Sequence, residues 1–154
     1  MKDVVSQKRV ALLHPKIIQG VTSFLNEAEA ALNIIIRVVW GIRTFAEQDA
    51  LYAQGRTTPG KIVTWSPAGS SYHNYGLAVD LAPVINNGTA LDWEYNYSKL
   101  VPIASKYGIS WGGNFPKGKK DYDHFENRFN LNWRSMLDLY KRKQFIPGTN
   151  FINI

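Results

Sequence analysis

The sequence contains no cysteine, and only three histidines and two methionines occur among its 154 residues. Without cysteine the fold cannot depend on disulfides, and any metal site must use histidine and carboxylate ligands. No apolar run approaches the roughly 20 residues that span a bilayer. The first residues, MKDVVSQKRVALLHPK, also lack the apolar stretch of a signal peptide. We therefore expect synthesis in the cytoplasm and no membrane insertion.

What is present is the composition of a folded globular protein, with 45% hydrophobic and 13% aromatic residues. At this length we expect one domain over residues 1–143, followed by a C-terminal tail over 144–154, and a monomeric protein. The net charge of +6 favours an anionic polymer as partner. Both nucleic acid and an acidic cell wall fit that description.

Periodicity and turn residues predict a mixture of helices and strands. Apolar residues at helical spacing after Pro15 predict a helix over 15–32. Thr44 and Glu47 match a capping box at the start of a second helix, and Gly55 suits its C-terminal end. Because the elements do not alternate as βαβ units, we predict an α+β fold. The remaining predictions are helices over 97–107 and 131–142, strands over 34–40, 77–82, 109–111 and 122–126, and loops over 56–70, with a short strand at 62–65, and over 112–120.

The stretch SSYHNYGLAVDL, residues 70–81, holds His73 and Asp80 seven positions apart. In an uninterrupted strand, residues with that spacing point to opposite faces. Gly76 offers a break in the backbone, which leaves His73 on an incoming loop and Asp80 on the strand. Ala78 lies on the face of Asp80 and is small enough to leave room for a metal ion.

A second stretch, DYDHFE at residues 121–126, adds a further histidine, His124. Catalytic zinc sites use three protein ligands from His, Asp and Glu and keep one position open for water. His73, Asp80 and His124 would form such a set. Taken singly, each histidine is more often a structural residue than a ligand, and His14 beside Pro15 keeps that interpretation.

An enzyme built on this set also needs a carboxylate that moves the proton of the attacking water. Three acids in the second stretch compete for that task. Strand alternation places Glu126 on the face of His124 and Asp123 on the opposite face, while Asp121 lies at the junction with the loop. Spacing alone does not choose among them.

Together, these motifs resemble a known family. SYHNYGLAVD matches the pattern S-x-H-x-x-G-x-A-x-D, and DYDHFE supplies a D/E-x-x-H pattern. The sequence resembles the zinc peptidases of the D-Ala-D-Ala carboxypeptidase and L-alanyl-D-glutamate endopeptidase family, which shares a superfamily with the hedgehog signalling domain. GIRTFAEQDALYAQGRTTPG, LHPKI and NWRSMLDLYKR are similar to the endopeptidase subgroup, which includes phage endolysins. The likeness runs from about residue 10 to 142.

The resemblance implies roles for individual residues. His73, Asp80 and His124 would bind one zinc ion, and Asp121 would be the general base and acid. Arg43 would either stabilise the oxyanion or hold a substrate carboxylate. Ser71 would contact either the substrate or a residue that binds zinc. Gln48 would stabilise the fold.

The resemblance also implies a fold and an activity. We expect a small, mostly antiparallel sheet with helices packed on it. The expected activity is zinc-dependent, cell-wall lytic hydrolysis of the L-alanyl-D-glutamate bond in the peptidoglycan stem peptide, after release through a holin-like pore. A D,D-carboxypeptidase or dipeptidase that releases D-Ala is one alternative, and a non-catalytic zinc-containing wall-binding module is another. On this interpretation nucleic acid is not a partner.

Overall fold

A five-stranded antiparallel sheet forms the centre of the computed structural model, which describes residues 1–154. Strand β2 is the middle of this sheet, because it pairs with β1 on one edge and with β5 and β3 on the other. Strand β4 pairs with the free edge of β5. The strands are β1 (Ile36–Trp40), β2 (Ala78–Ile85), β3 (Ala90–Leu91), β4 (Ser110–Trp111) and β5 (His124–Glu126).

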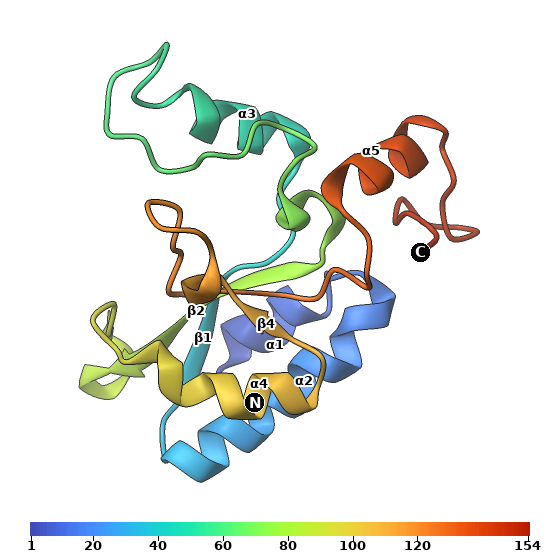
Figure 1. Ribbon diagram of the computed structural model, residues 1–154. Coiled ribbons are helices and arrows are strands. Elements are labelled where there is room, and N and C mark those ends of the chain that lie inside the picture. The colour runs from blue at the N-terminus through green and yellow to red at the C-terminus, as the bar shows by residue number, and fades with distance from the viewer.

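Helices cover the sheet unevenly (Figure 1). Helices α1, α2 and α4 gather on one side of it, whereas α3 and the chain after it extend away from the other side as an arm. The helices are α1 (Val4–Val10), α2 (Pro15–Leu32), α3 (Phe45–Ala53), α4 (Val101–Lys106) and α5 (Trp133–Lys141), with 3-10 turns η1 (Tyr72–Tyr75), η2 (Asn86–Gly88), η3 (Tyr97–Leu100) and η4 (Gly112–Asn114). This arrangement confirms the α+β prediction. No helix combines the length and the apolar character needed to cross a bilayer.

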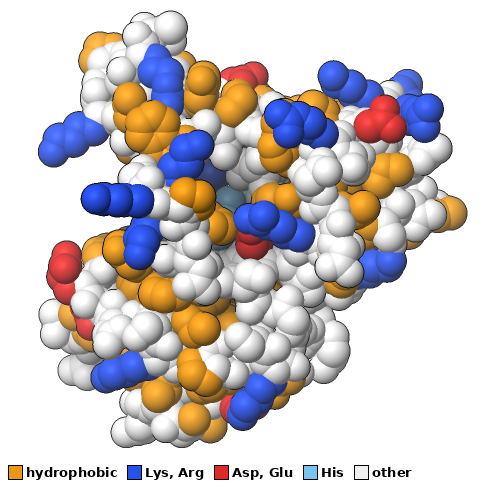
Figure 2. Space-filling model, in the orientation of Figure 1, with side chains coloured by type: hydrophobic (Ala, Val, Ile, Leu, Met, Phe, Trp, Pro, Cys, Tyr) orange, Lys and Arg blue, Asp and Glu red, His pale blue; other side chains and the backbone are white.

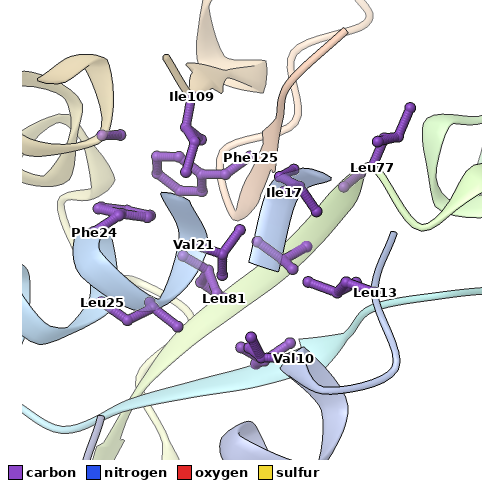
Figure 3. Packing of buried hydrophobic residues seen from close by; sticks show 14 of the residues in the cluster. Val10, Leu13, Ile17, Val21, Phe24, Leu25, Leu77, Leu81, Ile109 and Phe125 are labelled. Atoms are coloured by element: carbon purple, nitrogen blue, oxygen red, sulfur yellow. The ribbon is translucent and has the colours of Figure 1, made fainter. Parts of the chain in front are cut away.

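The hydrophobic core lies between α2 and the sheet (Figure 3). Helix α2 turns one apolar face inward, and its Val21, Phe24 and Leu25 are completely buried. Phe24 meets Phe125 of β5 with ring centroids 5.4 Å apart. Full burial of one such side chain contributes about 1.5–3 kcal/mol. The core thereby fixes β2 and β5, the two strands that carry site residues, against one rigid helix.

The predicted helix over 15–32 is confirmed, as is the capping box, in which Thr44 and Glu47 exchange hydrogen bonds at the start of α3. Gly55 follows α3 with a φ of +74°. The prediction that the strand over 77–82 stops before Pro83 is wrong, because β2 continues to Ile85. The carbonyl of Pro83 accepts a hydrogen bond from Asp92, away from β1, so the missing N–H of proline costs no bond to β1.

Other boundaries differ by a few residues. The helix predicted over 97–107 is divided into η3 and α4, because Pro102 must occupy the first turn of an α-helix. No strand forms at 62–65, and helix α1 was not predicted. The strands predicted at 34–40, 109–111 and 122–126 are shorter, and the last helix covers 133–141.

The C-terminal segment packs against the rest of the chain. Phe145 and Ile152 form an isolated bridge, and Ile152 is buried. The carbonyl of Ile152 accepts a hydrogen bond from Nε2 of the fully buried His14 at 2.8 Å. His14 is therefore occupied by a structural contact, as expected for the histidine beside Pro15.

Candidate metal centre

A turn and a strand deliver the first two residues of the site. His73 lies in η1, which ends at Gly76 with a φ of +68°, a conformation that side chains other than glycine rarely adopt. Strand β2 then begins at Ala78 and carries Asp80. The predicted break at Gly76 is therefore present, and it turns His73 back toward Asp80.

Sheet register delivers the third residue. Asp80 of β2 and His124 of β5 are directly opposite each other in the antiparallel pair, so their side chains share one face. His73 Nε2 lies 3.1 Å from Asp80 Oδ1 and 3.2 Å from His124 Nδ1. His124 Nδ1 lies 3.0 Å from Asp80 Oδ1. The structure thus brings the three predicted residues into one compact triangle.

The second nitrogen of each imidazole has its own acceptor. His73 Nδ1 donates to the carbonyl of Gly41 at 2.7 Å, and His124 Nε2 donates to Glu126 Oε2 at 3.0 Å. Each neutral ring then presents the lone pair of its remaining nitrogen to the centre of the triangle. Such outer hydrogen bonds orient histidine ligands in metal sites. With both rings neutral, two imidazole nitrogens and a carboxylate oxygen would converge as acceptors on one point.

The dimensions and charges of this triangle fit a divalent cation. Ligands about 2.0–2.1 Å from a tetrahedral zinc ion are roughly 3.3 Å apart, close to the observed separations. Burial alone lowers the pKa of His124, but its hydrogen bonds to Asp80 and Glu126 raise it to about 10. Burial raises the pKa of Asp80, yet the two histidines outweigh that effect and lower it. Asp80 and Glu126 stabilise the proton on His124 when no cation is present. A cation bound here would replace that proton.

The three competing acids have different surroundings. Glu126 is buried, and its two oxygens are taken by His124 and Arg128, so it orients His124 and is not free to move a proton. Asp121 and Asp123 both line the groove described below. The expectation that Asp123 faces away from His124 is wrong, because β5 begins only at His124 and alternation does not extend back to Asp123.

Asp121 and Asp123 form an acidic pair beside the triangle. Burial, the neighbouring Asp121 carboxylate and the negative charge of Asp80 raise the pKa of Asp123 to about 7. Asp121 is exposed, and its backbone N–H donates to the carbonyl of Gly112 at 3.2 Å. A Cβ atom on Gly112 would lie 2.4 Å from the Asp121 carbonyl and 3.0 Å from the His124 Cβ. The absence of a side chain at Gly112 therefore lets η4 pack against the turn that carries both residues.

Arg43 lies at the inner edge of the site and is buried. Its Nη1 donates to Gln48 Oε1 at 3.0 Å, and its Nη2 lies 3.6 Å from Asp80 Oδ2. The buried Nε of Arg43 makes no hydrogen bond. Gln48 is itself completely buried and donates to the carbonyl of Ser66 at 2.7 Å, so it braces the arm as predicted.

A groove of about 810 Å³ opens over the triangle. Trp40 at the end of β1, Val63 and Trp65 of the arm, and Ser71 line one part of it. The other wall contains Phe115, Lys119, the acidic pair, Arg128 and Trp133. In Figure 2 histidine atoms are visible at the floor of this hollow, and Lys and Arg side chains surround it. The groove gives an extended, anionic substrate access to the three residues.

Sequence reasoning missed two residues of this wall. Glu126 was considered only as a proton carrier. Its position two residues after His124, on the same face of the strand, also allows it to accept a hydrogen bond from the outer imidazole nitrogen, Nε2. Arg128 was not singled out at all. No pattern pointed to it, because β5 ends at Glu126 and alternation does not extend to residue 128.

Comparison with known proteins gives consistent relatives. A family model described as D-alanyl-D-alanine carboxypeptidase matches residues 64–127. The peptidoglycan L-alanyl-D-glutamate endopeptidase CwlK of Bacillus subtilis (strain 168) is 42% identical over 123 residues, which cover 74% of this chain and 72% of that protein. The L-Ala D-Glu endopeptidase ChiX of Serratia marcescens has a similar fold, with a TM-score of 0.59 at 21% identity over 86% of this chain and 90% of that one. A mutant of the vancomycin resistance D,D-pentapeptidase VanY, in complex with Zn(II), superposes with a TM-score of 0.54 at 17% identity over 75% of this chain and 72% of that one.

Proposed function

Because the chain belongs to the D-alanyl-D-alanine carboxypeptidase family of peptidases, we propose that it is a peptidoglycan endopeptidase that cuts the L-alanyl-D-glutamate bond of the stem peptide. The observation that carries this proposal is the convergence of His73, Asp80 and His124 beneath a groove that also contains a free carboxylate pair. The 42% identity to an enzyme named for that bond supports the choice of substrate.

The metal in this proposal is one zinc ion held by His73 Nε2, Asp80 Oδ1 and His124 Nδ1. Three protein ligands and an open position are the usual composition of a catalytic zinc site. Two neutral ligands and one carboxylate would leave the ion with net positive charge. When bound, zinc supplies Lewis acidity: it lowers the pKa of a coordinated water and polarises the scissile carbonyl.

The residues of the chain supply the proton transfers and the placement of charge. Asp121, exposed on the groove wall, accepts the proton of the attacking water and passes it to the amine of the departing D-glutamate. Arg43, fixed by Gln48 beside Asp80, stabilises the negative charge that develops on the carbonyl oxygen. Ser71 contacts the substrate at the floor of the groove.

Product analysis tests this proposal. The purified protein with zinc is incubated with muropeptides, and the products are identified by mass spectrometry. A stem peptide with a new N-terminal D-Glu is the expected result, and Asp121→Ala should bind zinc normally while losing this product. Release of D-Ala instead would identify a D,D-carboxypeptidase. Wall binding without any product would identify a non-catalytic module.

The biological setting belongs to the same proposal. The net charge of +6 and the basic side chains around the groove suit a cell wall that carries anionic polymers. We propose an endolysin-like role for a monomer that reaches the wall through a holin-like pore. Turbidity measurements test this: permeabilised cells should lyse on addition of the protein, and co-expression with a holin should cause lysis from within.

A further inference from the structure

Arg128 is held in place by three contacts on the wall of the groove. Its Nε donates to Glu126 Oε1, on the carboxylate that also accepts from His124. Its guanidinium lies 5.0 Å from the centre of the Tyr72 ring and 5.6 Å from that of Phe115. Although 49% of the side chain is exposed, the guanidinium is therefore held on one edge by Glu126 and lies close to two aromatic rings.

The other edge of this guanidinium is free. The two terminal amino groups of Arg128 make no hydrogen bond within the protein, although the residue lines the groove. A guanidinium carries five N–H donors in one plane, and Glu126 uses only one of its nitrogens. The remaining fork matches the two oxygens of a carboxylate. Because the group is already immobilised, an incoming carboxylate meets a preorganised partner and little rotamer freedom is lost.

The other cations of the groove are less suited to this task. Arg43 donates to Gln48 beside Asp80 and already has the proposed oxyanion role. Lys119 lies on the exposed loop after η4 and has no ion-pair partner. An ammonium group on a flexible stem does not impose the geometry that a fixed guanidinium does. Arg128 is therefore the cation best prepared for a specific carboxylate.

The proposed substrate offers a carboxylate near the scissile bond. Glutamate has two carboxyl groups, and a linear stem peptide uses only one of them to continue the chain. The other remains on the residue whose amine departs. Arg128 lines the same groove as His124, and Glu126 contacts both residues, so Arg128 is within the part of the groove that adjoins the triangle.

We propose that Arg128 determines specificity by binding the second carboxylate of the D-glutamate residue through its terminal amino groups. This inference rests on the proposed function, because it identifies one recognition contact of the same site. It gives the enzyme a preference for stem peptides in which that carboxylate is free over those in which it is an amide.

Two matched peptides test this inference. Both contain the L-Ala–D-Glu bond, and they differ only in whether the second carboxyl of D-Glu is free or amidated. For the wild type with zinc we expect a kcat/KM that is roughly tenfold to a hundredfold higher for the free acid, as a hydrogen bond to a charged group predicts. Arg128→Gln should lower the rate on the acid and bring this ratio close to one, and Arg128→Lys should restore it partly.

Arg142→Gln is the matched control, because it removes the same charge from an exposed residue of the surface and should leave the ratio unchanged. If Arg128→Gln slows both peptides equally and the ratio persists, Arg128 only holds Glu126 in place and the inference is overturned. A wild-type ratio of one also overturns the inference. The proposed function still stands in that case, because both peptides are cut at the expected bond. If the wild type cuts neither peptide, the proposed function fails and the inference with it.

Discussion

At the scale of single residues, the main choice lies between Asp121 and Asp123, two carboxylates on the same wall of the groove. We expect Asp121→Asn to lower kcat/KM by roughly 10²–10⁴-fold, the contribution typical of a general acid or base, with about one zinc still bound per chain. Asp123→Asn should cost less than tenfold. Steady-state kinetics and metal analysis of both variants check this. A larger loss for Asp123→Asn would transfer the proton-carrying role to that residue.

Asp123 also has a testable titration. Its pKa is raised to about 7, so the folded state binds this proton more tightly than the unfolded state does. The stability that it contributes is therefore fully present below about pH 4 and is lost as the pH rises through about 7. Zinc adds positive charge nearby and should lower the pKa. Carbon-detected NMR of the Asp carboxyl groups, without and with zinc, measures both values. Equal pKa values in the two samples would contradict this electrostatic account.

The sequence identified residues of the triangle but not the contacts that orient them. His73, Asp80 and His124 were predicted because their spacing around Gly76 and their motifs point to one site. The carbonyl of Gly41, which accepts from His73, could not be found that way, since a backbone acceptor leaves no pattern in side-chain types. The error about Asp123 had a similar origin, because strand alternation holds only within the strand, and the starting residue of a strand depends on its neighbours.

At the scale of elements, close packing of η4 against the turn at Asp121 should make Gly112 intolerant of any side chain. We expect Gly112→Ala to lower the free energy of unfolding by about 1–3 kcal/mol and to weaken zinc binding, since the new methyl group displaces the Asp121 carbonyl. Gly20→Ala is the matched control. Its Cβ meets only the Tyr107 carbonyl at 3.4 Å, and within α2 alanine should stabilise by up to about 1 kcal/mol.

Urea unfolding of the two glycine variants under identical conditions provides the measurement. Equal stabilities would show that η4 can move away without cost.

The element boundaries themselves were predicted well where local signals act alone, as in α2 with its Pro15 start and α3 with its capping box. They were predicted poorly at Pro83 and at β5, where the outcome depends on which strand lies alongside.

At the scale of the whole molecule, the triangle joins segments that are far apart in the chain, because His73 and His124 are 51 residues apart. Zinc that binds only the folded state should stabilise it by about 2.7 kcal/mol at a hundredfold excess over its Kd. For a chain of this size, that corresponds to a rise in Tm of roughly 5–10 °C. Calorimetry with zinc and with a chelator measures the shift. Asp80→Asn should reduce it sharply, and a shift of the same size in that variant would place the metal elsewhere.

The overall architecture could be predicted only as far as its class. An irregular alternation of helices and strands indicated α+β, and the resemblance implied an antiparallel sheet. The order of strands could not be read from either, because the pairing of β2 with β5 joins segments about 45 residues apart. That pairing is nevertheless what places Asp80 opposite His124.

The arm formed by α3 and the chain up to residue 67 has a consequence for how such enzymes diversify. It supplies part of the groove lining, yet it contributes none of His73, Asp80 and His124, and most of it precedes residue 64, where the match to the family model begins. This part of the groove is thus encoded in a stretch of the gene that precedes the codons of the three site residues. Recombination that replaces that stretch can exchange this part of the groove while His73, Asp80 and His124 are inherited unchanged.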